Sequence, residues 1–262
     1  PIRDFPEDHY VFMATKLGTV KKVPLEQFSK PRSQGLIALA LDEGDTLIGA
    51  AVTNGEQQVM LFASGGKCAY FEESAVRSMG RTARGVRGMR LAEGESIISL
   101  IIPQEDKLLL LACENGYGKR TDVSEFTVKG RGVQGVRAIM VNERNGQMVS
   151  AIQVDETDDI MLISDHGTLV RTPVEGISVS GRSAQGVVLI RLGEGEKLAR
   201  VERVDDTGSE EDIEDAELVE NSEGNVEDNG TSSPVNNSAD QEGDSTDNDR
   251  DAADDESDES GS

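Results

Sequence analysis

The sequence has few aromatic side chains and no long hydrophobic run. Its 262 residues include no Trp, three Tyr and six Phe, so a core must be built from Val, Ile, Leu, Met and Ala. No apolar run approaches the roughly 20 residues of a membrane-spanning helix, and we expect no membrane contact. The two cysteines, Cys68 and Cys113, lack metal-ligand spacing and are interpreted as free thiols of a reducing compartment.

The usual signatures of catalysis are also missing. There is no His, Cys and Asp cluster with metal-ligand spacing, no G-x-x-x-x-G-K-[ST] nucleotide loop and no G-x-S-x-G nucleophile motif. His9 and His166 stand alone, which favours surface or turn positions. We expect no catalytic residue, cofactor or metal in this sequence. Because Pro1 is not an initiator and no leader follows it, we expect a piece of a longer protein.

The formal net charge of -24 conceals two different regions. Residues 204–262 contain 23 acidic residues and one basic residue, Arg250, which leaves 27 acidic and 25 basic residues before them. The tail cannot bury enough apolar surface to fold, so we predict that residues 204–262 are disordered. Residues 1–203 form a nearly neutral body.

The body is a fourfold repeat of about 50 residues. Three sets of glycines recur at that period, each set falling once in every repeat. They are Gly18, Gly66, Gly116 and Gly167; Gly35, Gly85, Gly135 and Gly186; and Gly44, Gly94, Gly146 and Gly195. The predicted units span roughly 8–54, 55–104, 105–155 and 156–203.

Each repeat is predicted to be β-structure. The apolar runs VFMAT, VMLFA, LLLLA and IMLIS are short and end at glycine-containing turns, as hairpin strands do. After the second glycine the pattern alternates, with Met89 and Leu91 on one side and Arg90 on the other. Four strands per repeat favour propeller-like blades over a stacked solenoid or an irregular sandwich.

Basic residues gather in the same loop and hairpin of successive repeats, while acidic residues gather in turns such as DEGD and GEGE. If the repeats are radial, the basic loops form a positive belt. Such a belt suits duplex DNA bound through its phosphates without reading sequence. The alternative is a set of ordinary solvated loop charges. The predicted DNA-binding residues are Lys21, Lys22, Lys30, Arg32, Arg77, Arg81, Arg84, Arg87, Lys119, Arg120, Lys129, Arg131, Arg137, Arg171 and Arg182.

The segments FMATKLGTVKKV, VRSMGRTARGVRGMRL, NGYGKRT and ISDHGTLVRTPV resemble the C-terminal β-pinwheel of the DNA gyrase A family of bacterial type IIA topoisomerases. The resemblance covers residues 1–203, and many members of the family also end in an acidic tail. It implies an all-β pinwheel of four-stranded blades, four here of the family's usual six. The family's Q-R-R-G-G-K-G box is absent, the nearest match being KGRGVQG at Lys129–Gly135.

The resemblance implies that this part wraps duplex DNA. The rest of gyrase A, together with gyrase B, would complete an A2B2 enzyme of the bacterial cytoplasm and nucleoid, which uses ATP and Mg²⁺ through other domains to introduce negative supercoils. In the family the catalytic tyrosine follows an arginine, and neither Tyr10, Tyr70 nor Tyr117 does so.

Two alternatives remain for the body and two for the tail. The body resembles, less closely, the C-terminal domain of the A-type component of topoisomerase IV, and a propeller can also serve as a protein-docking module without DNA. The tail is either a solubilising end or a DNA mimic that competes for the basic belt.

Overall fold

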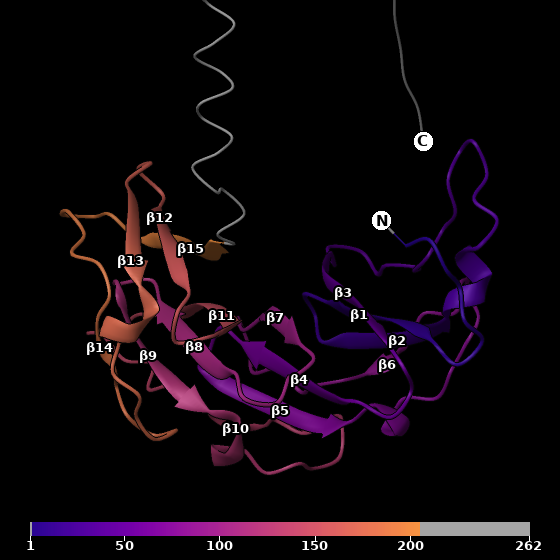
Figure 1. Ribbon diagram of the computed structural model, residues 1–262, viewed down its shortest axis with the longest axis horizontal. Helices are drawn as coiled ribbons and strands as arrows, with labels where there is room; N and C mark the ends of the chain where they lie inside the picture. Colours follow the sequence, from indigo (N-terminus) through magenta and orange to yellow (C-terminus); the bar gives the residue numbers. More distant parts are fainter. Residues whose placement is uncertain (1, 205–262) are drawn as a thin grey trace, which may run out of the picture. The chain divides into compact units, whose positions relative to one another are not determined.

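The computed structural model describes residues 2–204, which form four antiparallel β-sheets that follow one another along the chain (Figure 1). We predict the acidic tail to be disordered from residue 204, but Val204 is the last residue of the final strand and pairs with Asp159. Residues 205–262 lie outside the described residues. Within residues 2–204, no helix has the length and apolar character that crossing a membrane requires.

Neighbouring sheets contact one another through one edge of each sheet, which we call the inner edge. From its inner to its outer edge, the first sheet consists of β3 (Leu47–Thr53), β1 (Tyr10–Thr15), β2 (Thr19–Pro24) and β6 (Val86–Arg87). The second consists of β7 (Ile97–Ile101), β4 (Gln58–Ala63), β5 (Lys67–Glu72) and β10 (Val136–Arg137). The third consists of β11 (Met148–Val154), β8 (Leu108–Cys113), β9 (Tyr117–Asp122) and β14 (Val187–Val188). The fourth consists of β15 (Leu198–Val204), β12 (Asp159–Ser164) and β13 (Leu169–Pro173).

A short 3-10 helix follows the second hairpin strand of every repeat. The four helices are η1 (Leu25–Phe28), η2 (Glu73–Ala75), η3 (Val123–Glu125) and η4 (Val174–Gly176). The all-β, blade-like prediction is therefore confirmed, and the β-hairpins lie where the short apolar runs placed them.

The composition of the sheets differs from the expectation that each repeat completes its own sheet. The outer strand of every four-stranded sheet comes from the following repeat: β6 pairs with β2, β10 with β5 and β14 with β9. Figure 1 shows β10 beside β5 and β6 beside β2. We call each of these pairings a joint, and number the joints first, second and third along the chain.

The joints use one backbone scheme. The hairpin glycine of one repeat accepts two main-chain hydrogen bonds from the next repeat, as when Gly18 O accepts from Gly88 N (2.8 Å) and Met89 N (3.3 Å). Gly66 O and Gly116 O receive the same pair of bonds at the second and third joints.

The glycines of the three sets are needed for this geometry, since all have positive φ. At Gly135 (φ 77°), a methyl group would also overlap the Cys68 carbonyl oxygen at the second joint. Gly35, whose φ is nearly the same but which belongs to no joint in residues 2–204, has open space around it.

Side-chain alternation along the strands builds a core on both faces of the middle sheets. On β4, Met60 and Phe62 pack toward the third sheet, while Leu61 and Ala63 pack toward the first. The three core clusters each combine buried residues of two successive sheets, and aliphatic side chains dominate them as the composition predicts.

Candidate nucleic-acid interface

The basic loops lie at the outer edge of the sheets. We name them the rim loops: residues 29–35, 77–85, 127–135 and 178–186, each of which follows a 3-10 helix. The last three lead directly into the outer strands β6, β10 and β14. Their backbone position is therefore fixed by the joints, and equivalent residues of successive loops occupy equivalent places.

The structure leaves most of the predicted DNA-binding side chains accessible. Arg81 and Arg182 are half-buried. The exposed ones are Lys30, Arg32, Arg77, Arg84, Arg87, Lys129, Arg131, Arg137 and Arg171. Except for Arg171, which lies on β13, these exposed residues belong to rim loops or outer strands.

For four residues the prediction is wrong, because their side chains are buried and their charges are used inside the protein. They are Lys21, Lys22, Lys119 and Arg120, with exposed fractions of 0%, 6%, 0% and 3%. The sequence suggested surface hairpin charges. In the structure, the rim loop and 3-10 helix of the following repeat cover these positions.

Lys22 and Arg120 occupy the same place in β2 and β9, as shown by their pairing with Phe12 and Leu110. Lys22 Nζ lies 3.7 Å from a carboxylate oxygen of the fully buried Glu73 and 4.8 Å from the centre of the Tyr10 ring. Arg120 donates to the carbonyl oxygens of Ile177 (2.5 Å) and Glu175 (3.2 Å). Both cations therefore hold the 3-10 region of the next repeat.

Rim-loop arginines also connect successive repeats, a role that the sequence pattern did not predict. Arg81, Arg131 and Arg182 each donate from a guanidinium nitrogen to a carbonyl of the preceding repeat: Ile37 O at 3.2 Å, Arg87 O at 3.1 Å and Arg137 O at 2.8 Å. All three arginines lie four residues before the second glycine of their repeat, and this shared spacing was the available signal. A guanidinium has five N–H donors, so donors remain for phosphate.

Two of the exposed predicted cations, Arg84 and Arg171, pair with acidic residues. The Arg84 guanidinium lies 2.9 Å from the Asp42 carboxylate, and both of these side chains are exposed. Arg171 forms an ion pair with Asp159 at 2.6 Å. An exposed pair such as Arg84–Asp42 contributes little to stability.

The acidic turns support the hairpin tips of the sheets. The buried Asp45 accepts a hydrogen bond from Leu17 N at 2.9 Å. Glu196 accepts from the Ser164 hydroxyl and from Gly193 N, and these bonds lower the pKa of its carboxyl group to about 2. The turn carboxylates are therefore hydrogen-bond acceptors of the fold as well as a source of negative charge.

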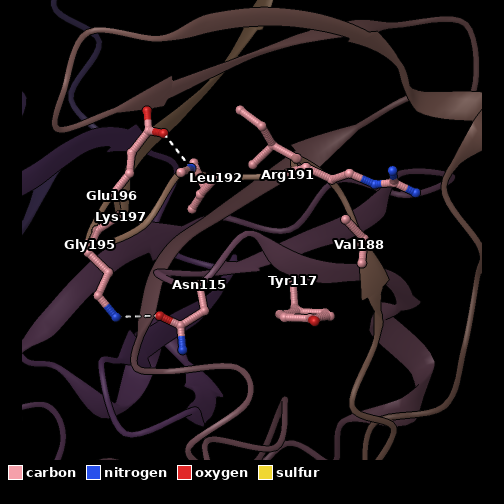
Figure 2. Close-up of a pocket in the computed structure, with 10 residues that line it drawn as sticks. Asn115, Tyr117, Val188, Arg191, Leu192, Gly195, Glu196 and Lys197 are labelled. Carbon is pink, nitrogen blue, oxygen red and sulfur yellow. Dashed lines mark hydrogen bonds between the residues drawn. The ribbon is translucent and has the colours of Figure 1, made fainter.

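A shallow pocket of about 500 Å³ lies between the hairpin tip of the third repeat and residues 188–197 (Figure 2). Lys197 donates to the side-chain oxygen of Asn115 and lies 3.6 Å from Glu114, while the Arg144 guanidinium stacks over the Tyr117 ring at 4.2 Å. Arg191 extends from the opposite wall. These groups hold one another, and no nucleophile with a neighbouring base is among the pocket-lining residues.

Among residues 2–204, no group of three or more His, Cys, Asp or Glu side chains is arranged to hold a metal ion. Cys68 and Cys113 are buried free thiols, and burial raises the pKa of both.

The repeats match a known family. Residues 9–54, 57–104, 107–155 and 158–205 each match the family described as "DNA gyrase C-terminal domain, beta-propeller". The chain belongs to this family. DNA gyrase A of Pseudomonas aeruginosa is 57% identical over 214 residues, which are 81% of this chain and 23% of that protein. DNA gyrase A of Escherichia coli is 50% identical over 82% of this chain and 24% of its own length.

Solved structures give the same fold. The DNA gyrase A C-terminal domain aligns with a TM-score of 0.69 and 28% identity, over 78% of this chain and 68% of that one. The C-terminal domain of DNA topoisomerase IV aligns with a TM-score of 0.74 and 26% identity, over 84% and 69% of the two chains. The chain spans about a quarter of the length of the gyrase A relatives, and the family that it matches is their C-terminal domain.

Proposed function

We propose that the rim loops bind duplex DNA through its phosphates, and that this chain is the DNA-wrapping C-terminal portion of a gyrase A protein. One observation carries the proposal: exposed arginines and lysines recur in the rim loops of the first three repeats, and the joints fix the last three rim loops along one edge of the sheets.

A row of separate cations suits a long, bent polyanion. Bending 20–30 base pairs of duplex DNA costs of order 1–6 kcal/mol, and several distributed phosphate contacts can offset that cost. Contacts of this kind position the duplex without reading its bases. In the whole enzyme, the remainder of gyrase A and the gyrase B protein would complete an A2B2 assembly in the bacterial cytoplasm. That assembly would use ATP and Mg²⁺ in other domains to introduce negative supercoils.

Salt dependence of DNA binding tests the proposal. The 262-residue chain is titrated with linear duplex DNA at several salt concentrations, and its affinity is expected to fall steeply between about 50 and 200 mM salt. The double variant Arg77→Ala, Arg87→Ala should reduce the slope of log affinity against log salt by about 2, since each phosphate contact contributes about 0.9. The control Arg191→Ala removes an exposed arginine that lies in the pocket of Figure 2 and should leave the slope unchanged.

Failure to bind duplex DNA at low salt would refute the rim proposal and favour a docking module. The structural likeness to the topoisomerase IV domain supports a second candidate, in which the rim selects the DNA substrate without wrapping it. The two are separated by measuring the linking number of a relaxed plasmid after binding and ligation, because only wrapping shifts it.

A further inference from the structure

Two lysines of the sheets are fully buried beneath rim loops. Lys21 on β2 and Lys119 on β9 occupy equivalent positions, which pair with Met13 and Leu111, and both are 0% exposed. Lys119 Nζ donates to the carbonyl oxygens of Gly181 (2.7 Å) and Arg182 (2.8 Å). Lys21 Nζ donates to the carbonyl oxygens of Arg81 and Ala38, the latter at 2.9 Å.

The two lysines hold the same point of two different loops. Arg81 and Arg182 both lie four residues before the second glycine of their repeats, so each lysine reaches across a joint to the loop of the next repeat. The second and fourth repeats carry Ala69 and Val170 at this position. The contact therefore exists at the first and third joints and not at the second.

Stability alone does not account for a lysine at such a place. Burying an ammonium group costs free energy that hydrogen bonds to carbonyls only partly recover, and an apolar side chain of similar volume is often as stabilising or more so. What the ammonium adds is a fixed position for two carbonyl oxygens of a glycine-containing loop.

The held loop is then fixed at two levels. The lysine holds the main chain at Arg81 or Arg182, and the guanidinium of the same arginine donates to a carbonyl of the preceding repeat. A preorganised loop loses less conformational entropy when it binds its ligand.

We propose that Lys21 and Lys119 are positioning residues for DNA binding: without touching DNA, they hold the rim loops 77–85 and 178–186 in the conformation that presents their cations to the phosphates. This inference rests on the proposed function of the rim.

The test uses Lys119→Met in the 262-residue chain. The affinity for linear duplex DNA at about 100 mM salt should fall roughly three- to tenfold, with a salt slope lower by about 1, the value expected when one phosphate contact is lost. Lys119→Gln, which keeps an N–H donor, should recover part of the loss.

Coupling between substitutions separates positioning from general destabilisation. The double variant Lys119→Met, Arg182→Ala should lose no more DNA affinity than the more damaging of the two single variants, because both substitutions act on one loop. Combining Lys119→Met with Arg77→Ala, which lies in the loop held by Lys21, should multiply the two fold-changes. The proposal is wrong if the losses multiply in both combinations, or if Lys119→Met loses its β-type circular dichroism spectrum, since the lysine would then serve the whole body.

Amide hydrogen exchange gives a reading that does not depend on DNA. Lys119→Met should speed exchange across residues 178–186 and leave residues 77–85 unchanged, and equal changes in both loops would overturn the proposal. If the unaltered chain fails to bind DNA while this loop-specific change appears, the proposed function fails and the holding of the loop by Lys119 stands.

Discussion

The second joint differs from the first and third in the side chains that cover it. At the first and third joints, buried cations on β2 and β9 reach into the next repeat: Lys21 and Lys22 in one case, Lys119 and Arg120 in the other. At the second joint the same places on β5 are taken by Ala69 and Tyr70, and Phe126 stacks edge-on against Phe62 with ring centres 6.3 Å apart.

The difference shows that one backbone scheme tolerates two kinds of packing. All three joints use the same hydrogen bonds to a hairpin glycine, so the strand exchange does not depend on the side chains beside it. An apolar joint gains stability from buried area, whereas a joint built on cations gains a fixed loop at some cost in desolvation. Substitutions at the two kinds of joint should therefore have different effects.

The largest effect is expected at the apolar joint. Phe126→Ala should lower the free energy of unfolding by about 3 to 5 kcal/mol, because it removes a buried ring and leaves a cavity against Phe62. Phe28→Ala is the matched control, since Phe28 ends η1 in the first repeat and is half-buried. Urea unfolding measures both, and equal losses would show that the aromatic pair has no special role at the second joint.

Breaking the ion pair of the first joint should rank next. Glu73→Gln leaves Lys22 buried without its counter-charge and should cost about 3 kcal/mol. The double variant Lys22→Met, Glu73→Gln removes both charges and should recover most of the loss. As a surface control, Glu93→Gln should change the unfolding free energy by less than about 0.5 kcal/mol. A double variant as unstable as Glu73→Gln alone would contradict the assignment.

The shared backbone predicts equal sensitivity at joints of both kinds. Gly135→Ala and Gly186→Ala each place a methyl group against a main-chain carbonyl, of Cys68 and of Gly118 respectively. Each should cost about 2 kcal/mol more than Gly35→Ala, which adds only the strain of a positive φ in open space. Thermal unfolding of the three variants checks this. A large difference between Gly135→Ala and Gly186→Ala would show that the backbone scheme is not shared.

The smallest effect is a pH dependence of stability between pH 7 and 9, which comes from the buried lysines of the first and third joints. Burial lowers the pKa of Lys119 from 10.5 to about 8, so the folded chain releases this proton at a lower pH than the unfolded chain. The unfolded state then binds more protons, and the contribution of Lys119 to stability rises as pH increases through about 8. Burial lowers the pKa of Lys21 in the same direction.

The buried cysteines lower the free energy of unfolding as the pH rises further, which is opposite to the effect of the lysines. Burial raises the pKa of Cys113 from 9.0 to about 12, so its contribution is lost as pH rises above about 9. Between pH 7 and 9, the free energy of unfolding should therefore rise with pH. This rise should be smaller in Lys119→Met, and urea unfolding at several pH values measures it. An identical pH profile in the variant would refute the assignment to Lys119.

Much of this protein follows from local sequence. The glycine sets at a period of about 50 residues determined the repeats and their positive-φ turns, and the short apolar runs determined the hairpin strands. The basic residues before Gly85, Gly135 and Gly186 marked the loops that lead into the outer strands. These features depend on neighbours in the chain, and the sequence displays such neighbours directly.

Only the tertiary structure decided which repeat supplies each outer strand and which cations reach the surface. The exchange of β6, β10 and β14 joins segments of different repeats, which no pattern within one repeat specifies. Lys21 and Lys119 look as exposed in the sequence as Lys30 and Lys129, yet they are buried because the next repeat's rim loop lies over them and offers its carbonyl oxygens. A charge is assigned to solvent or to the interior by what packs over it, and here that neighbour lies about 60 residues further along the chain.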